Sequence, residues 1–299
     1  MILAEHITRT LGGTWRGQNG LACCPAHEDC APSLSLGVGV DGRLLVHCHA
    51  GCAYGAVMDA LKTRGLMDHK TRTTIGSTLA SRVEIAANRK AKQAEAEKRA
   101  RQARMLWDSG QPITSTLGER YLRARGITCA LPHSLRYVES CWHKSAQRLP
   151  AIVARVDGVA RFAVHRTYLR KDGSAKAEVE SPKAMLGSVR GGAVRLTPPS
   201  PTSNLVVAEG IETALSLPSG LMNRSAEVWA ALSAGGLANV TLPNRAGDLI
   251  IAPDGDGHGR EAAQTLARRA HALGWHVMML PAPEGFDWND VLLGKAVAA

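Results

Sequence analysis

Residues 249–257 are Leu249-Ile250-Ile251-Ala252-Pro253-Asp254-Gly255-Asp256-Gly257, an apolar run that passes directly into two aspartates separated by a glycine. A second apolar run, Leu205-Val206-Val207-Ala208, passes into Glu209-Gly210 in the same way. Short apolar runs that are bounded by turn residues are typical of buried strands. Carboxylates at the ends of such strands are expected at the carboxyl edge of a parallel sheet, where ligands of α/β proteins bind.

The surrounding sequence alternates strand-like and helix-like segments. Strands that alternate with helices form βαβ units, which place helices on both faces of a mainly parallel sheet. We therefore predict an α/β fold for residues 201–299, which follow a Pro-rich boundary at residues 197–201. The predicted strands are 204–208, 227–232, 248–252 and 276–280, and the predicted helices are 212–217 and 260–273.

The acidic residues at the ends of these strands suit a hard metal ion. Mg²⁺ prefers oxygen ligands and keeps several of its waters, and the intervening glycines permit a tight turn and the close approach of a phosphate group. Asp-Gly-Asp-Gly by itself is equally typical of an ordinary turn, but the addition of Glu209 favours a metal site. Because neighbouring carboxylates repel each other, a divalent cation is expected between them.

A cluster of cysteine and histidine residues lies near the N-terminus. Five of the seven cysteines fall between Cys23 and Cys52, and they supply the pairs Cys24-x-x-His27 and Cys48-x-x-x-Cys52. The runs 33–36 and 44–47 alternate like a β-hairpin, which is the arrangement of a zinc ribbon with four N/S ligands. Reduced core cysteines are the alternative interpretation. The neighbouring residues that are alternative ligands are Cys23, Cys30, His47 and His49.

The remainder of the chain divides by composition. Residues 1–68 are predicted to form the zinc ribbon, closed by a helix at 54–61, and residues 69–109 a basic linker helix. From Arg82 to Trp107 this linker has no Gly or Pro, and it is interpreted either as a solvated connection or as a phosphate-binding surface. Residues 110–200 are expected to form an α+β segment. Its predicted elements are a helix at 117–125 and strands at 151–156, 161–169 and 193–196.

The charge of the chain favours a polyanionic partner. Its 299 residues include 36 Lys and Arg against 26 Asp and Glu, a formal net charge of +10, and nucleic acid is the commonest partner of such a protein. The longest apolar runs fall far short of the roughly 20 residues that span a bilayer, so no membrane partner is expected. The first ten residues lack the apolar stretch of a signal peptide, and we expect a cytoplasmic protein.

The cysteine and histidine cluster carries a family resemblance. The run Cys24-Pro25-Ala26-His27, continued by Ala31-Pro32-Ser33-Leu34-Ser35-Leu36 and closed by His47-Cys48-His49-Ala50-Gly51-Cys52, resembles the CHC2-type zinc-binding domain of bacterial and phage DNA primases. The family commonly has two residues between the last two cysteines, whereas this chain has three. The resemblance implies a module that helps to engage single-stranded template and to select the start site. The zinc ligands that it implies are Cys24, His27, Cys48 and Cys52.

The acidic motifs carry a second resemblance. Glu209-Gly210 and Asp254-x-Asp256 are similar to the signature of a Toprim domain, the catalytic fold of bacterial-type primases, of type IA and type II topoisomerases and of some nucleases. The stretches 209–216 and 286–292 look particularly like Toprim proteins of phages and mobile elements. The resemblance implies that Asp254 and Asp256 hold Mg²⁺ or Mn²⁺ and that Glu209 acts as an acid/base or a further ligand.

Further acidic positions follow from the same resemblance. Many primases carry an acid four residues after the first Glu, where this chain has Thr213, and Glu212, one place earlier, is not expected to bind metal. Asp287 is the candidate for the distal acidic position. Asp290 is expected to cap the final helix.

Nucleotide and template phosphates need cations that the acidic motifs do not supply. The segment before residue 200 is weakly similar to the amino-terminal half of the primase polymerase core, and it holds several basic residues. A solvated surface role is the alternative for each of them. The candidates are Lys183 and Arg166, favoured as a pair, together with Arg190, Arg195, Arg170 and Lys176.

Taken together, the two resemblances imply a DNA primase that makes short RNA primers on single-stranded DNA from ribonucleoside triphosphates. A Toprim nuclease is one alternative, although the zinc module argues against it, and a non-catalytic nucleic-acid-binding accessory protein is another. A topoisomerase is disfavoured because the four tyrosines lie in no recognisable strand-breaking module. The sequence contains no G-x-x-x-x-G-K-[ST] motif, so a replicative helicase is expected as a separate partner.

Overall fold

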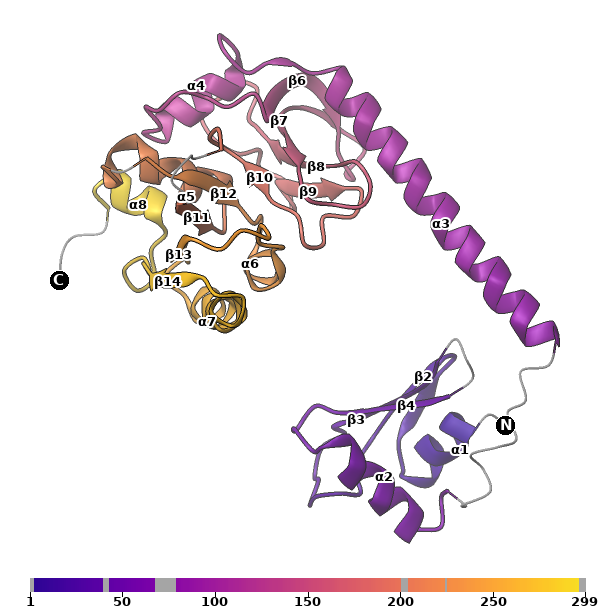
Figure 1. The fold of residues 1–299 in the computed structure, drawn as a ribbon. Helices are drawn as coiled ribbons and strands as arrows, with labels where there is room; N and C mark the ends of the chain where they lie inside the picture. The colour runs from indigo at the N-terminus through magenta and orange to yellow at the C-terminus, as the bar shows by residue number, and fades with distance from the viewer. Residues whose placement is uncertain (1–2, 40–42, 68–78, 200–203, 224, 296–299) are drawn as a thin grey trace. The chain divides into compact units, whose positions relative to one another are not determined.

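The computed structural model describes residues 3–39, 43–67, 79–199, 204–223 and 225–295. The chain divides into two compact units, Met1–Gln93 and Ala94–Ala299. Residues 68–78, where the predicted linker begins, lie outside the described residues, as do the last residues of the Pro-rich boundary. Each unit is described by itself below, with the element labels of Figure 1.

The first unit is an antiparallel sheet with two short helices. Four strands lie in the order β1-β2-β3-β4, and the register pairs Leu36 of β3 with Val46 of β4, which confirms the predicted hairpin. Apolar side chains from the helices and the central strands, such as Ile7, Leu34 and Leu61, form a small core. The elements are α1 (Leu3–Thr10), β1 (Thr14–Arg16), β2 (Asn19–Ala22), β3 (Leu34–Val38), β4 (Leu44–Cys48) and α2 (Tyr54–Thr63).

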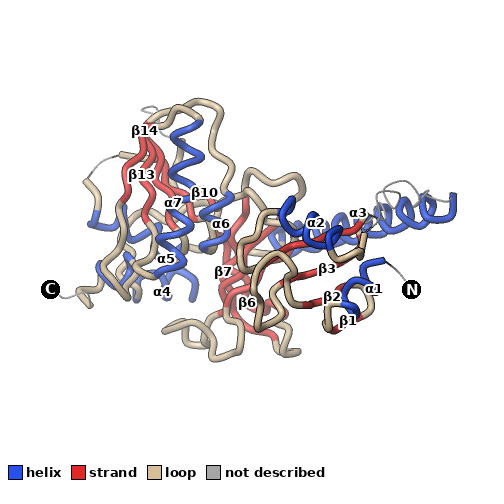
Figure 2. Tube along the Cα trace, turned by 90° about the horizontal axis from the view of Figure 1, so that it is seen from below, coloured by secondary structure: helices blue, strands red, loops and turns tan. Residues whose placement is uncertain are grey.

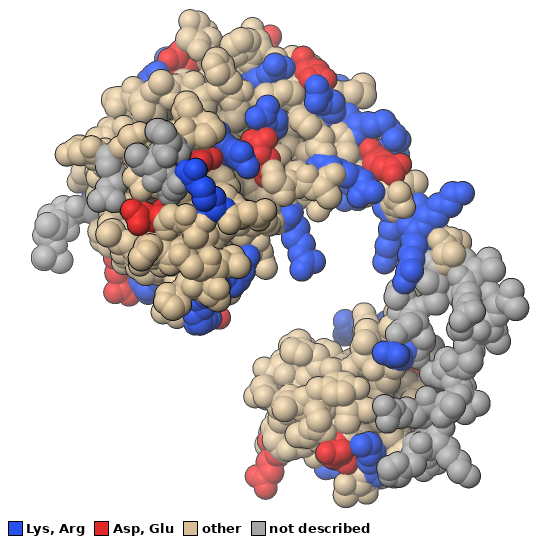
Figure 3. Space-filling model, in the orientation of Figure 1, with Lys and Arg blue, Asp and Glu red and all other residues tan. Residues whose placement is uncertain are grey.

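A long helix, α3 (Leu79–Asp108), contains the predicted basic helix. Pairs of opposite charge one turn apart support it, with 2.9 Å between Arg99 Nε and Glu95 Oε1 and 3.0 Å between Arg104 Nε and Asp108 Oδ2. Its last turns pack onto the following sheet through Ala103 and Trp107. Before these turns the described side chains are mostly exposed, and Lys and Arg gather over the helix (Figure 3).

The middle of the chain forms an antiparallel sheet in the order β5-β6-β7-β8-β9, together with α4 (Leu117–Ala124). Alternate residues of the strands face opposite sides. On one side Val164 and Tyr168 pack with Trp107 of α3, and on the other side Ile152 and Ala163 join a core shared with the C-terminal sheet. The strands are β5 (Gln111–Pro112), β6 (Leu135–Trp142), β7 (Arg148–Val156), β8 (Ala163–Tyr168) and β9 (Lys183–Leu186).

The C-terminal sheet has the predicted α/β architecture. Its order is β10-β12-β11-β13-β14, and all neighbours are parallel except β10 and β12. Val206 faces one core with α5, while Val207 faces the other with α6 and α7, so helices cover both sides (Figure 2). The strands are β10 (Val194–Arg195), β11 (Asn204–Ala208), β12 (Glu227–Ala230), β13 (Asp248–Ala252) and β14 (His276–Met279). The helices are α5 (Ile211–Ser216), η1 (Leu217–Leu221), α6 (Ala234–Asn239), α7 (Gly257–Ala272) and α8 (Trp288–Leu292).

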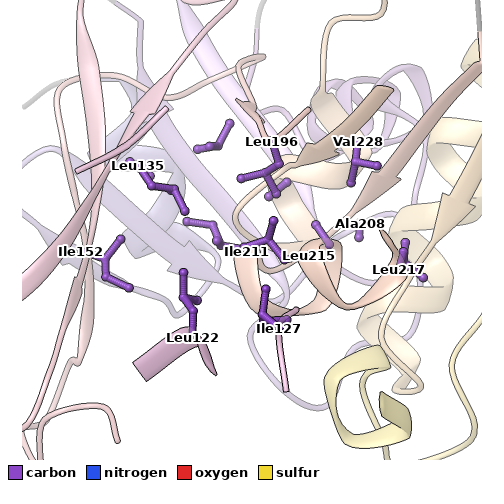
Figure 4. Packing of buried hydrophobic residues seen from close by; sticks show 14 of the residues in the cluster. Leu122, Ile127, Leu135, Ile152, Leu196, Ala208, Ile211, Leu215, Leu217 and Val228 are labelled. Atoms are coloured by element: carbon purple, nitrogen blue, oxygen red, sulfur yellow. The ribbon is translucent and has the colours of Figure 1, made fainter. Parts of the chain in front are cut away.

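One hydrophobic core joins the middle sheet to the C-terminal sheet. Leu122 and Ile127, with Leu135 and Ile152, pack against Ile211 and Leu215 (Figure 4). Strand β10 lies before the predicted boundary at residue 200 but hydrogen-bonds to β12 of the C-terminal sheet. The division into segments 110–200 and 201–299 stays a prediction. Among the described residues, no helix is both long and apolar enough to cross a membrane.

Candidate functional site

The acidic residues meet at the carboxyl edge of the C-terminal sheet. Strands β11 and β13 are parallel neighbours whose last residues, Ala208 and Ala252, are directly paired. Glu209 follows the first strand, and Asp254 follows the second after one proline. The backbone amide of Asp254 donates a hydrogen bond to the Glu209 carboxylate. The structure therefore brings these two predicted site residues into contact.

Asp256 and Asp287 are fixed at the starts of two helices. Asp256 caps α7 by accepting a hydrogen bond from the Gly259 amide at 2.6 Å, and Asp287 caps α8 by accepting one from the Asp290 amide at 2.8 Å. The prediction that Asp290 caps the final helix is wrong, because Asp290 lies inside the first turn and its carboxylate pairs with Lys295 at 3.0 Å.

Close backbone packing brings the two caps together. The Gly255 amide donates to the Phe286 carbonyl at 2.8 Å, and the Gly285 amide donates to the Gly255 carbonyl at 3.0 Å. A Cβ at Gly255 would collide with the Pro283 carbonyl, so this approach requires glycine. The turn after β13 is thereby tied to the segment that carries Asp287.

Burial and mutual repulsion raise the pKa of two of these carboxyl groups. Burial, followed by the charge of Asp254, raises the pKa of Glu209 to about 7, although the amide of Asp254 opposes the shift. Burial, followed by the charge of Asp287, raises the pKa of Asp254 to about 6. The buried Glu209 Oε1 has no hydrogen-bond partner in the described part of the chain. An oxygen-rich cluster with an unpartnered buried oxygen fits a divalent cation such as Mg²⁺.

The predicted zinc ligands also converge. One ligand atom from each of Cys24, His27, Cys48 and Cys52 lies within 4.8 Å of the others, and Cys52 Sγ is 3.2 Å from His27 Nδ1. Burial raises the pKa of the Cys48 thiol, but amide hydrogen bonds from Cys52 and Ala50, with smaller side-chain contributions, outweigh it and lower the pKa to about 6. Three sulfurs and one imidazole nitrogen at this spacing fit a closed tetrahedral zinc site.

Asp29 holds the residues around the cysteine and histidine cluster in place. Its carboxylate accepts hydrogen bonds from the Cys24 amide at 2.6 Å and the Ser33 hydroxyl at 2.5 Å, and it lies 3.7 Å from His27 Nε2. Carboxylates in this position orient the histidine ligands of zinc. The alternative ligands His47 and His49 contact each other edge to face, with 4.7 Å between ring centroids. Neither they nor Cys23 and Cys30 belong to the cluster of four.

Comparison with known families covers most of the second unit. Residues 97–196 match a domain of unknown function, DUF7146, and residues 204–297 match the Toprim domain. Residues 204–297 form a Toprim domain. No curated protein matches the chain.

Three solved primase structures are similar to the chain. The zinc-binding and RNA polymerase domains of Aquifex aeolicus primase are 15% identical, with 98% of this chain and 80% of that chain covered and a TM-score of 0.38. A DNA primase domain from Pseudomonas aeruginosa is 17% identical, with coverages of 60% and 56% and a TM-score of 0.30. The RNA polymerase domain of Mycobacterium tuberculosis primase is 16% identical, with 62% of each chain covered and a TM-score of 0.27.

Two neighbouring residues of the Toprim domain face different partners. The Thr213 hydroxyl donates to Asp254 Oδ1 at 3.4 Å, so a neutral donor contacts the acidic cluster where many primases carry an acid. Glu212 is buried among groups from the preceding domain, and its Oε1 accepts from the Tyr121 hydroxyl at 2.7 Å and lies 3.0 Å from Lys176 Nζ. Burial opposes ionisation of Glu212, but the charges of Lys183 and Lys176 and the Tyr121 hydrogen bond hold its pKa far below the usual range.

Among the favoured basic candidates, the structure brings only Lys183 to the acidic side of the Toprim domain. Lys183 Nζ is 3.8 Å from Glu212 Oε2, and its charge acts on the Glu209 and Asp254 carboxyls. Thr167 of β8 pairs with Lys183 of β9. Arg166 precedes Thr167 in the strand, so its side chain lies on the opposite face of the sheet, against the Tyr168 ring. The pair favoured by the sequence is therefore split between two faces.

The other basic candidates lie elsewhere. Arg195 on β10 stacks over the Trp229 ring at 5.0 Å, and Arg190 is exposed in the turn before that strand. Arg170 pairs with Glu178 on the surface. Lys176, a secondary candidate from the sequence, is the second lysine at Glu212. No spacing rule links Tyr121, Lys176 and Glu212, so only the tertiary fold reveals this group.

Proposed function

We propose that the protein is a DNA primase that makes short RNA primers on a single-stranded DNA template. The observation that carries this proposal is the Toprim cluster of Glu209, Asp254 and Asp287. Glu209 is buried, the pKa values of Glu209 and Asp254 are raised, and Glu209 Oε1 has no hydrogen-bond partner among the described residues. The Cys24, His27, Cys48 and Cys52 cluster in the same chain supports a primase over the other uses of a Toprim domain, because it resembles the zinc-binding domain of primases.

The residues of the cluster take separate roles in nucleotidyl transfer. Asp254 and Asp256 would hold Mg²⁺ or Mn²⁺, which when bound neutralises the triphosphate and aligns it for in-line displacement. Asp256 Oδ1 accepts the α7 cap hydrogen bond, and we assign metal binding to the other carboxylate oxygen, which has no hydrogen bond among the described residues. Asp287 adds charge beside Asp254, and Glu209 is a further ligand or the acceptor of the proton from the attacking 3′-hydroxyl.

The proposal includes structural zinc at the cysteine and histidine cluster of the first unit. It also includes polyanionic partners for the positive net charge of the chain. Single-stranded DNA and ribonucleoside triphosphates are the expected partners, with backbone phosphates rather than base stacking dominating affinity, because aromatic residues make up only 4% of the chain. We further propose a cytoplasmic location, a separate replicative helicase as partner and membership of the phage and mobile-element group. These rest on the sequence motifs alone.

Incubation of the full chain with single-stranded DNA, labelled ribonucleotides and Mg²⁺ or Mn²⁺ tests this function. We expect template-dependent oligoribonucleotides from the wild type and none from Asp254→Asn. Asp248→Asn is the matched control, because Asp248 is exposed at the other end of the same strand. Shortened DNA would instead indicate a nuclease, and DNA binding without either product would indicate an accessory protein.

A further inference from the structure

A tryptophan of the middle sheet is open to solvent. Trp142, the last residue of β6, is 54% exposed, whereas the other described tryptophans are partly or fully covered. Burial of an indole is strongly favourable, so an exposed one gives up stability that packing would supply. No other large apolar side chain in the described stretch from Glu139 to Leu149 is exposed. The ring therefore stands alone and lacks the wider apolar surface that a protein partner needs.

A β-bulge determines the side of the sheet on which Trp142 lies. Val138 of β6 pairs with Ala151 of β7. Three residues later Cys141 pairs with Leu149, only two residues back along β7, so β6 contains one extra residue. The bulge reverses the alternation of side chains along the strand, and Cys141 shares a core with Val138. Trp142 is thereby turned away from α3 and onto the side whose core is shared with the Toprim domain.

The backbone that carries Trp142 is fixed from the other side of the sheet. Its carbonyl accepts hydrogen bonds from the Tyr168 hydroxyl at 2.7 Å and from Arg166 Nη1 at 3.3 Å. The next residue, His143, is buried, packs edge to face on the Tyr168 ring and has its Nε2 3.1 Å from the Ser181 carbonyl. An exposed ring on so constrained a backbone loses little freedom when a ligand stacks on it.

The charge beside the ring favours a nucleic acid as the ligand. Arg148 pairs with Trp142 across the hairpin, so the two side chains share a face. Its guanidinium donates to the Ser140 carbonyl in the bulge at 3.1 Å and is otherwise exposed. The nearby Lys144 is paired with Glu180 at 3.2 Å. An aromatic ring next to a cation fits an unpaired nucleotide, because its base stacks on the ring while its phosphate is attracted by the charge.

This position is distinct from the nucleotide site at the acidic cluster. Ile152 of β7 pairs with Thr167 of β8, which in turn pairs with Lys183 of β9, the residue nearest the cluster. Arg148 precedes Ile152 by four residues, which displaces Trp142 from this row by roughly 13 Å along the strands, at about 3.3 Å per residue. A strand that stacks on Trp142 therefore contacts the protein outside the site of phosphoryl transfer.

We propose that Trp142 is a base-stacking platform for single-stranded DNA. One unpaired base lies on the exposed indole face, and Arg148 lies beside the phosphate of that nucleotide. The proposal rests on the nucleic-acid partner of the proposed function, and it assigns a base contact to the domain of unknown function, residues 97–196. A single platform agrees with an aromatic content of 4%, because it adds one local contact to binding that backbone phosphates dominate.

Binding of two oligomers to the full chain tests the platform. One is oligothymidylate, and the other is an abasic oligomer of equal length, which has the same phosphates but no bases. Trp142→Ala is expected to weaken oligothymidylate binding about tenfold, the loss of one stacked base, and to leave binding of the abasic oligomer unchanged. Trp142→Phe keeps an aromatic face and is expected to retain most of the affinity.

Leu273→Ala is the matched control, because Leu273 at the end of α7 is 61% exposed and its truncation also removes a large apolar surface side chain. It is expected to bind both oligomers as the wild type does. Wild-type affinity of Trp142→Ala for oligothymidylate, or equal losses for the two oligomers, would overturn the platform. If thermal unfolding shows that Trp142→Ala does not fold, Trp142→Met replaces it, since methionine covers a similar surface without an aromatic face.

Salt dependence separates stacking from charge. A stacked base releases no counterions, so Trp142→Ala should lower log affinity for oligothymidylate equally at every salt concentration. A slope reduced by about 0.7 would indicate a lost phosphate contact and would overturn stacking. Binding of ATP with Mg²⁺ is expected to be unchanged, because Trp142 lies outside the nucleotide site. A loss of ATP affinity would assign the indole to the nucleotide base and overturn its role with the DNA strand.

The two proposals fail in different ways. If the base-dependent loss appears but no primer forms, the primase function is wrong and the platform stands. If primers form while Trp142→Ala binds both oligomers as the wild type does, the platform alone is wrong. In primer synthesis, Trp142→Ala is expected to raise the template concentration for half-maximal rate about tenfold with little change in the KM for ribonucleotides, since its contact serves template binding.

Discussion

Gly255 shows how a single residue sets the geometry of the acidic cluster. Its α-carbon lies directly against the Pro283 carbonyl, and its amide and carbonyl both bond to the segment that carries Asp287. A side chain at this position must push the two segments apart. The close spacing of Asp287 and Asp254 therefore depends on the absence of a Cβ at Gly255.

We predict that Gly255→Ala destabilises the protein by about 1–3 kcal/mol, the usual cost of forcing an extra methyl group into a packed site. It should also reduce primer synthesis, because Asp287 moves away from Asp254. Thermal unfolding and the primer assay measure the two effects. Gly257→Ala is the control, since a Cβ there meets nothing within 4 Å. Equal effects of both substitutions would contradict the packing argument.

His165 predicts a pH dependence of stability. Burial, with the charge of Lys183, lowers its pKa from 6.5 to about 4, and its Nδ1 has no partner in the described residues. Between these values only the unfolded state takes up the proton, so this histidine makes the free energy of unfolding fall by roughly 1.4 kcal/mol per pH unit on acidification. Above pH 6.5 and below about pH 4 its contribution is constant.

The measurement is the difference between the wild type and His165→Gln in urea unfolding from pH 7 to pH 4. Glu209 and Asp254 have raised pKa values and so act in the opposite direction over part of this range, which makes the slope of the wild type alone uninformative. The variant should lose acid sensitivity relative to the wild type. Parallel curves for the two proteins would show that His165 titrates normally.

The cluster of Cys24, His27, Cys48 and Cys52 draws its side chains from two turns that β3 and β4 bring together. The core of the first unit is small, and units of this size commonly need a metal to fold. We predict that a chelator unfolds this unit within the full chain while the second unit stays folded. Far-UV circular dichroism and limited proteolysis would show a partial transition, and an unchanged signal would contradict it.

Asp29→Asn tests the support of the zinc ligands by their neighbour. The carboxylate fixes the Cys24 turn and lies beside His27, so its neutralisation should weaken zinc binding about 10–100-fold in a competition assay. Glu28→Gln, one residue away, is the control and is expected to bind zinc as the wild type does. Equal affinities of all three proteins would contradict a supporting role for Asp29.

Periodicity and motif spacing predict the elements of the C-terminal sheet well, because each strand there is a continuous apolar run that ends in a turn. The β3–β4 hairpin, α2 and most of α3 were predictable for similar local reasons. Strands β1, β2, β5 and β9 were not predicted, since each is short. The longer β6 was not predicted either, since a register shift between Val138 and Cys141 interrupts its alternation. Nor does the sequence show that β10 belongs to the C-terminal sheet, because its position depends on pairing with β12.

The functional site was likewise predictable only in part. Glu209, Asp254 and Asp256 follow buried strands, so their proximity was predictable, and the ligand pairs of the metal cluster carry their own spacing. Arg166 and Lys183 have equal charge and similar contexts in sequence, and only strand register places them on opposite faces. The capping role of Asp287 rather than Asp290 depends on where α8 begins, a boundary that sequence fixes poorly.

For the molecule as a whole, the net charge of +10 predicts salt-sensitive binding to single-stranded DNA. We expect log affinity to fall linearly with log salt. Replacement of the exposed Lys90, Lys92 and Lys98 of α3 by Gln should reduce the slope by about two units if all three contact phosphates, at a slope of roughly 0.7 for each contact. Fluorescence anisotropy at several salt concentrations measures it. An unchanged slope would identify α3 as a solvated connection.

Strand β10 has a practical consequence for any attempt to isolate the Toprim domain. A fragment that begins at residue 204 would remove the antiparallel partner of β12 and leave a row of free amide and carbonyl groups along an otherwise buried, apolar strand. Such an open edge recruits strands from other molecules. The fragment would therefore tend to self-associate, and a soluble version should begin upstream of Val194.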